Sequence, residues 1–433
     1  MRKHEQRPKS AYARKEHANP AAKWLVAIVC VHLVLAGVYW HYTPYGTPPD
    51  EGPHGLYVEA LAGRQILPVF DAADRENYES HQPPLYYLMG VPFYLIARAA
   101  GEAEPASAVR LLSMLLGALS ILVVYRAVGT AFPEERRLAL ASAGFVALLP
   151  THVMLSSSVS NDILAEVVFG LALVVTAQIV INGPSRVRTI ALGAILGAGL
   201  LTKTTCILLF PVAVLAYLLA WQRAKPTWKL AAGHLSGLLG IGALIGGWWL
   251  VRNQLLYGDA LAMRQFEQAF EHTVKPAYWL SHGWSMGTYL ILVSTWTFCS
   301  FWGVFGHMYV FMPAEIYCTL GVITLAAMVG CVREELALRA KSAQNRDIIL
   351  VYNLVFALVV LAFLKFNVTF YQAQGRYLYP ALVPISVFWV LGIRRLLPAR
   401  IRDFGAYVAV AVPLVAQIVA LATCIVPKMP YYF

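Results

Sequence analysis

The sequence predicts an all-α polytopic membrane protein, and three observations support this prediction. Of the 433 residues, 59% are hydrophobic and only 13% are charged, and the mean hydropathy is +0.60. Apolar runs long enough to cross a bilayer recur from residue 24 to residue 426. Basic residues gather in alternate loops between these runs, as they do in the cytoplasmic loops of helical membrane proteins.

The same observations exclude other classes of protein. A net charge of +11 would favour nucleic-acid binding in a soluble domain, but here the loops account for it, so we expect no nucleic-acid partner. Six cysteines are scattered through the chain without CxxC spacing, and most lie in apolar runs. They predict neither a disulfide framework nor a zinc site.

We expect a single transmembrane domain over residues 24–433, preceded by a basic segment. Residues 1–23 are rich in Lys and Arg, contain no apolar run and are expected to form a disordered cytoplasmic arm. Residues 24–42 form the first span and resemble an uncleaved anchor. About eleven crossings are expected, and the other spans cover residues 108–131, 138–157, 162–181, 189–201, 205–221, 230–250, 312–332, 348–366, 378–394 and 405–426.

The apolar segment 85–99 decides the orientation of every later loop. It is short, carries Pro92 and Arg98, and is joined to the next span by an acidic linker with Glu102 and Glu104. We expect it to lie in the outer interface rather than to cross the membrane. Residues 43–107 then form one outer loop, and residues 252–311 form a second.

The distribution of charge supports this layout. About two thirds of the Lys and Arg residues fall in loops assigned to the inside, whereas about two thirds of the Asp and Glu residues fall outside. The bias predicts a cytoplasmic N-terminus and an outer C-terminus. We expect an integral protein of the bacterial inner membrane.

The stretch from Pro48 to Tyr87 is the candidate active site. It places Asp50, Glu51, His54, Glu79 and His81 directly after the first apolar run. Carboxylates and imidazoles are the groups that perform general acid and base catalysis. A cluster of them at a membrane surface predicts acid and base chemistry there, in what would be the outer catalytic loop.

Further polar residues lie next to later spans and are expected on the same face. A charge at membrane depth costs a few kcal/mol, so it usually has a partner or a task. Guanidinium and ammonium groups are the usual partners of phosphate, so Lys203 and Arg376 could hold the phosphate of a lipid-linked substrate. We expect the acids near the first span and these cations to meet in one pocket at the outer leaflet. The other residues of this set are Asp162, Arg252 and Tyr377.

An ordered set of motifs resembles a known superfamily. The set is DE at 50–51, HxxY at 54–57, HQPPLYY at 81–87, SND at 160–162, TK at 202–203, WWxxRNxxxYGD at 248–259, SFWGxFG at 300–306 and QGRYLYP at 374–380. It is similar to the GT-C superfamily of polyprenyl-phosphate-sugar-dependent glycosyltransferases, in the branch of the protein O-mannosyltransferases and the lipid A aminoarabinose transferases. The resemblance spans nearly all of residues 24–395.

The resemblance implies a fold, a reaction and site residues. It implies short juxtamembrane helices over a cavity in the first outer loop, with residues 85–99 among them. It implies that the carboxylates of Asp50, Glu51 and Glu79 are catalytic. Relatives commonly have a lysine before the two prolines, where this chain has His81-Gln82. The substrate-binding candidates are Lys203, Arg376, His54, His81, Tyr57, Asp162, Arg252 and Tyr377.

The chemistry of sugar transfer requires the same carboxylates and cations. Transfer from a lipid phosphate to a hydroxyl passes through an oxocarbenium-like centre, and a carboxylate takes the proton of the acceptor. Cations stabilise the departing phosphate. Asp50 is our first choice for the base, and a single displacement would invert the sugar carbon. The expected partners are a polyprenyl-phosphate-linked sugar, a protein, lipid or glycan acceptor, and the bilayer.

Other interpretations of these residues stay open. Asp50 could cap a helix, and the role of Lys203 could be limited to extending its ammonium group to the membrane–water interface. His54 and His81 could hold zinc or manganese together with Glu51 or Glu79, although histidines that only make hydrogen bonds are the simpler interpretation. The chain could also be a transporter or flippase of lipid-linked sugars, or a non-catalytic scaffold. We predict no other cofactor.

Overall fold

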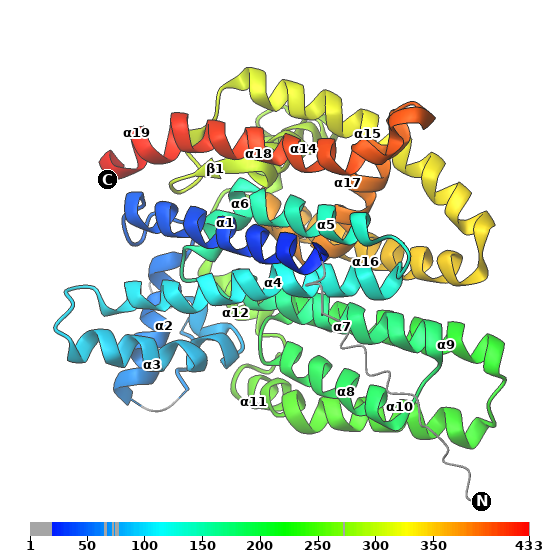
Figure 1. Cartoon of the computed structure of the whole chain (residues 1–433). Helices are drawn as coiled ribbons and strands as arrows, with labels where there is room; N and C mark the ends of the chain where they lie inside the picture. The colour runs from blue at the N-terminus through cyan, green and yellow to red at the C-terminus, as the bar shows by residue number, and fades with distance from the viewer. Residues whose placement is uncertain (1–19, 65–66, 72, 74–77, 272, 433) are drawn as a thin grey trace, which may run out of the picture.

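The computed structural model describes residues 20–64, 67–71, 73, 78–271 and 273–432. It confirms the predicted all-α membrane fold, because the described ranges contain nine helices that are long and apolar enough to cross a membrane, or ten if one bent pair counts as a span. Figure 1 shows the helices packed side by side, with α2 and α3 beside one end of α4. The spans are α1 (Pro20–Tyr42), Pro105–Ala131 with α4 (Arg110–Ala131), α7 (Asp162–Asn182), Thr204–Ala224 with α9 (Leu209–Ala224), Trp228–Tyr257 with α10 (Trp228–Gly242) and α11 (Trp248–Tyr257), α15 (Ala314–Lys341), α16 (Ala343–Thr369), Gly375–Leu396 with α17 (Leu382–Leu396), and Ala399–Tyr431 with α18 (Gly405–Ala420) and α19 (Val426–Lys428).

The count of about eleven crossings is not confirmed. The predicted span 138–157 is the bent pair, in which α5 (Arg136–Leu148) and α6 (Pro150–Ser156) meet at 68°. Pro150 stands at the first position of α6 and forces an extended Leu149 before it, which explains the bend. The predicted span 189–201 is α8 (Arg186–Leu200), whose 15 residues are about 22 Å long and so shorter than the hydrocarbon core.

Helix α7 forms the centre of the bundle. It is apolar on every side, and 83% of its most apolar window is buried, against 17% for α1. An evenly apolar helix belongs inside a bundle rather than at its surface. α7 packs against α4, α8 and α9. Its first residue, Asp162, is therefore carried into the interior of the protein.

The loops assigned to the inside meet at one end of the bundle. Their ion pairs join Arg137 to Asp403 at 2.8 Å, Arg394 to Glu135 at 2.9 Å, Arg395 to Glu334 at 3.4 Å and Arg223 to Asp347 at 3.5 Å. These partners come from different loops. The grouping of loops by charge therefore agrees with the contacts between them.

The two long loops contain further short elements. In the first, helices α2 (Glu51–Arg64) and α3 (Leu85–Ala99) flank the 3₁₀ turn η1 (Tyr78–His81). In the second lie α12 (Met263–Ala269), α13 (Pro276–Ser281), α14 (Met286–Gly303) and a small antiparallel hairpin of β1 (Val304–Phe305) and β2 (Val310–Phe311). Most of the predicted cytoplasmic arm lies outside the described residues. The remaining elements are η2 (Pro105–Val109), η3 (Thr204–Leu208), the π-helical turns η4 (Ala243–Gly247) and η7 (Leu421–Ile425), and the 3₁₀ turns η5 (Gly375–Ala381), η6 (Ala399–Phe404) and η8 (Met429–Tyr431).

Candidate active site

A cavity of about 270 Å³ gathers charged residues that are far apart in the sequence. Asp50 comes from the loop after α1, Glu79 from η1, Lys203 from the turn before η3, and Arg376 from η5. Each position is the end of a helix or the start of the next one. The helices therefore bring acids from the first loop and cations from later helices to one place, as the sequence suggested.

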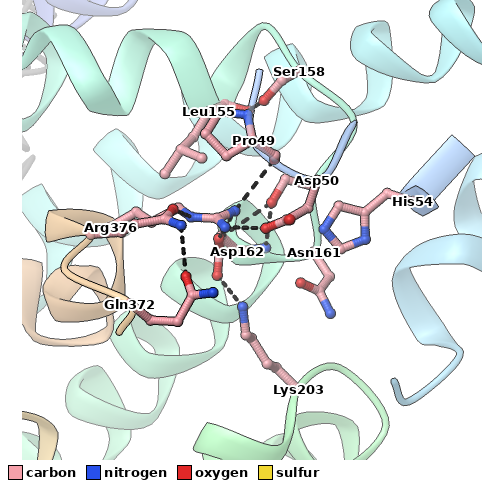
Figure 2. A network of polar contacts seen from close by, with 12 residues as sticks. Pro49, Asp50, His54, Leu155, Ser158, Asn161, Asp162, Lys203, Gln372 and Arg376 are labelled. Atoms are coloured by element: carbon pink, nitrogen blue, oxygen red, sulfur yellow. Dashed lines mark hydrogen bonds and ion pairs between the residues drawn. The ribbon is translucent and has the colours of Figure 1, made fainter. Parts of the chain in front are cut away.

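Four charged side chains form one network (Figure 2). The guanidinium of Arg376 pairs with Asp50 and donates to Asp162 Oδ2 at 3.3 Å. The ammonium of Lys203 pairs with the other oxygen of Asp162. Arg376 Nε also donates to Gln374 Oε1 at 2.7 Å, which fixes the plane of the guanidinium. Two positive and two negative charges thus balance inside the protein, as buried charges require.

The backbone at Asp50 has an unusual conformation. Its φ angle is +65°, in the left-handed region that residues other than glycine seldom adopt. The carboxylate of Asp50 accepts hydrogen bonds from Tyr78 and Arg376, and these contacts hold the residue in this conformation. Burial by itself would raise the pKa of Asp50, but the charge of Arg376 and the two hydrogen bonds outweigh it and lower the pKa. Tyr78 was missed by the sequence analysis, although it directly precedes Glu79.

Glu79 has the opposite electrostatic environment. Its Oε2 atom is buried, accepts no hydrogen bond from the residues that the structure describes, and lies 3.6 Å from Nδ1 of His54. His54 Nδ1 is also 2.9 Å from the hydroxyl of Tyr87. Burial, together with the nearby charge of Asp50, raises the pKa of Glu79 to about 8, and burial lowers the pKa of His54 to about 3. Both groups are therefore mainly neutral at pH 7.

Glu51 is buried next to the cavity but does not line it. Its two oxygens accept from Arg110 Nε at 2.7 Å and Nη2 at 2.6 Å, and from the backbone N–H groups of Gly46 at 2.8 Å and Val159 at 2.9 Å. These bonds tie the first loop, α4 and the loop before α7 together. Glu51 is thus engaged in structure, and Arg110, which the sequence analysis missed, is its partner. The signal was a lone arginine at the start of an apolar run.

Tyr57 and Arg252 also lie away from the cavity walls. The hydroxyl of Tyr57 donates to the carbonyl of Gln82 at 3.3 Å, and its ring stacks on Tyr87. Arg252 donates to the carbonyl of Pro68 at 2.6 Å. By contrast, the sequence candidate Tyr377 does line the cavity, with its ring 6.0 Å from the ammonium of Lys203 and 5.2 Å from the guanidinium of Arg376.

The described residues do not fit the metal alternative. Among them, no three His, Cys, Asp or Glu side chains lie close enough to hold a metal ion. His54 is engaged with Tyr87, and His81 Nδ1 lies 2.5 Å from the carbonyl of Tyr78. Burial lowers the pKa of His81 to about 4, which keeps it neutral.

The rest of the cavity wall is apolar. Val359, Ala362, Phe363 and Phe366 line it from one face of the membrane-spanning helix α16, at the spacing of successive helical turns. Further apolar side chains come from η3 and from α12 with the residue after it. They are Leu208, Met263, Phe266 and Phe270. The cavity therefore has a charged end and an apolar wall that belongs to a membrane span.

Comparison with known proteins supports the resemblance found in the motifs. Residues 81–249 match the family model of dolichyl-phosphate-mannose-protein mannosyltransferases. The structure is similar to apo ArnT from Cupriavidus metallidurans, at 15% identity and a TM-score of 0.51, over 96% of this chain and 78% of that one. The chain has the GT-C fold.

A second GT-C structure shares this arrangement. It is the archaeal oligosaccharyltransferase AglB from Archaeoglobus fulgidus in complex with an inhibitory peptide and a dolichol-phosphate, at 13% identity and a TM-score of 0.51. The match covers 95% of this chain and 56% of that one. No curated protein matches the chain in sequence. The resemblance to GT-C proteins that the motifs indicated is confirmed.

Proposed function

We propose that this GT-C protein transfers a sugar from a polyprenyl-phosphate donor to a hydroxyl group of a cell-envelope acceptor. The observation that carries the proposal is the cavity, in which the Lys203 and Arg376 cations adjoin an apolar wall of α16. A lipid phosphate has the matching two parts, an anionic head and a hydrocarbon chain. The dolichol-phosphate bound to the structurally similar AglB supports this choice of ligand.

Donor binding requires Arg376 to exchange one of its carboxylate partners for the phosphate. Lys203 and Arg376 are paired with Asp162 and Asp50, so each has a carboxylate where a phosphate oxygen would bind. A phosphate that takes the place of Asp50 on Arg376 keeps the guanidinium paired and releases the Asp50 carboxylate. Asp162 stays beneath both cations and holds them in position. Charge-assisted hydrogen bonds to the phosphate strengthen as the sugar leaves it, which lowers the barrier.

The reaction we propose is a single displacement. The acceptor oxygen bonds to the anomeric carbon, the bond from that carbon to the phosphate oxygen breaks, and the electron pair leaves with the phosphate. The sugar carbon is inverted. A carboxylate takes the acceptor proton, and Asp50 and Glu79 are the two described carboxylates that line the cavity. Asp50, the base proposed from the sequence, has both oxygens engaged until the phosphate arrives.

We place the reaction at the outer face of a bacterial inner membrane. The ion-paired basic loops gather at one end of the bundle, whereas the cavity is built from the opposite ends of the same helices. Basic loops mark the cytoplasmic side. The N-terminus is then cytoplasmic, and the cavity opens to the side on which the envelope is assembled. The acceptor is a protein, a lipid or a glycan.

The test is transfer by the purified protein. It is supplied with sugars carried on polyprenyl phosphate and with envelope acceptors. Lys203→Met is compared with Lys229→Met, which removes an exposed lysine at the start of α10. We expect transfer by the wild type and by Lys229→Met, and a loss of about 10²–10³-fold in Lys203→Met, because the departing phosphate loses a cation. Equal transfer by both variants would contradict the phosphate site. Movement of the intact lipid across vesicles, without transfer, would establish a flippase instead.

A further inference from the structure

We infer that Glu79, which lies against His54, takes the proton of the acceptor, and that Asp50 holds Arg376 until the donor phosphate replaces it. The inference rests on the proposed transfer and assigns its proton acceptor. It is carried by the difference in free hydrogen-bonding capacity between the two carboxylates of the cavity.

Asp50 has little capacity left for an acceptor hydroxyl. One of its oxygens accepts from Tyr78, and the other accepts from Arg376. A carboxylate stabilised by two donors of this kind is a weak base, because protonation would cost both interactions. Even after Arg376 turns to the phosphate, the Tyr78 hydroxyl still donates to Asp50. Asp50 is better suited to position the arginine than to receive a proton.

Glu79 has the capacity that Asp50 lacks. Its Oε2 atom is buried in the wall of the cavity and has no hydrogen-bond partner among the described residues. A buried polar atom that is left unpaired costs free energy, and a catalytic role is one of the reasons for which native structures keep such an atom. Glu79 itself lines the cavity, so a rotation of its side chain would bring this oxygen to the hydroxyl of an acceptor bound there. His54 contacts the same oxygen at 3.6 Å, and the bond of His54 to Tyr87 fixes the direction of the ring.

The groups that face Glu79 come from every element around it. Asp50, from the loop after α1, is the negative neighbour, and Asp162 adds a second negative charge from α7. Lys203 and Arg376 supply the opposing positive charges. The remaining titratable neighbours are His54, Tyr57, Tyr78, His81, Tyr87 and Tyr377.

The balance of these groups suits a general base. Burial and the charge of Asp50 raise the pKa of Glu79 to about 8, and a base is most effective when its pKa lies near the working pH. In the step itself the acceptor O–H bond breaks and its proton passes to Oε2 of Glu79. The acceptor oxygen bonds to the anomeric carbon while the phosphate departs with the electron pair. Glu79 returns its proton to water when the products leave.

The pH dependence of turnover distinguishes the two carboxylates. With Glu79 as the base, kcat of the wild type rises about tenfold per pH unit up to about pH 8 and is constant above it, because only the ionised form accepts a proton. Asp50 is ionised throughout this range, so it would give a constant kcat from pH 5 to pH 9. A constant kcat in an active wild type would overturn the inference and leave the proposed transfer intact. An inactive wild type would instead argue against the transfer.

Two variants complete the test. Glu79→Gln should lower kcat by about 10²–10⁴-fold and remove the pH-dependent rise, whereas Glu102→Gln, the same change in an exposed acid, should alter neither. Asp50→Asn should keep the rise but move its midpoint below pH 8, because the charge of Asp50 is one cause of the raised pKa of Glu79. A Glu79→Gln protein that retains the wild-type rate would contradict the inference.

A measurement that needs no turnover protects the test against an unstable variant or an unsuitable acceptor. Infrared spectra of the wild type should show a protonated carboxyl band at pH 7 that disappears with a midpoint near pH 8. Glu79→Asp serves as a second variant, in which the band should shift. The absence of any carboxyl titrating between pH 6 and pH 9 would overturn the inference directly.

Discussion

Asp50 and Glu51 are consecutive acids, each paired with a buried arginine, yet they belong to two different kinds of region. Glu51 accepts four N–H donors from Arg110, Gly46 and Val159, and no part of it reaches the cavity. Asp50 lines the cavity with a side chain that is 30% exposed. Burial and charge alone do not separate a catalytic network from a structural ion pair such as that of Glu51 with Arg110. Access to a cavity and unpaired hydrogen-bonding groups do.

The largest effect is expected from breaking the ion pair of Glu51 with Arg110. Arg110→Met leaves Glu51 buried and unpaired, and removing one partner of a buried ion pair costs about 3–5 kcal/mol. We expect a matching decrease in the free energy of unfolding, measured in detergent by tryptophan fluorescence. The double variant Arg110→Met with Glu51→Gln should recover part of this loss, because no charge remains unpaired. If Arg110→Met were as stable as the wild type, this ion pair would have no structural role.

A pH-dependent effect on stability is expected from Glu79. Its pKa is about 8 in the folded protein, against the ordinary value of 4.5 for a glutamate carboxyl, so the folded state binds more protons between these values and stability falls as the pH rises through them. Glu79→Gln removes this loss. We expect the melting temperature of Glu79→Gln minus that of the wild type to become more positive from pH 5 to pH 8.5. A constant difference across this range would contradict the neutral state of Glu79.

A smaller effect is expected from the carboxylate that pairs both cations. Asp162→Asn removes a negative charge that lies next to both cations and repels a phosphate bound to them. We expect polyprenyl phosphate to bind about tenfold more tightly, since one unit charge near the site is worth on the order of 1.4 kcal/mol or more. Turnover should decrease because the product leaves more slowly. Unchanged or weaker binding, measured by calorimetry, would argue against this repulsion.

The smallest effect is expected at the opposite end of the bundle. Arg137 and Asp403 form an ion pair whose side chains are 61% and 77% exposed. Exposed pairs of this kind contribute about 0–1 kcal/mol. Arg137→Met should therefore leave both the melting temperature and the transfer rate close to those of the wild type. A large loss of transfer would show that the end of the bundle far from the cavity also takes part in the reaction.

Charges beside the later spans predicted a part of the site that the first loop does not supply. Lys203 and Arg376 could be chosen because a cation beside a span is costly and must have a partner, and both line the cavity. Tyr57 was chosen because it follows the acidic pair in a motif. In α2 its helical position turns it toward Tyr87 instead, away from the cavity. A local motif does not fix the direction of a side chain.

The tertiary partners could not be predicted from the sequence. Arg110 meets Glu51 across 59 residues, and only the packing of α4 against the first loop brings them together. The crossings were predicted from length and hydropathy, which located the apolar segments but not the break at Pro150 or the short span α8. Proline restricts the backbone of the residue before it, so Leu149-Pro150 indicates a break in the helix. It does not give the angle between α5 and α6.

A structure with bound polyprenyl phosphate tests the central claim most directly. We predict phosphate oxygens within hydrogen-bonding distance of Lys203 and Arg376, Asp50 separated from Arg376, and the lipid chain against Val359, Phe363 and Phe366 of α16. A phosphate bound elsewhere, with both cations still paired to Asp162 and Asp50, would contradict it.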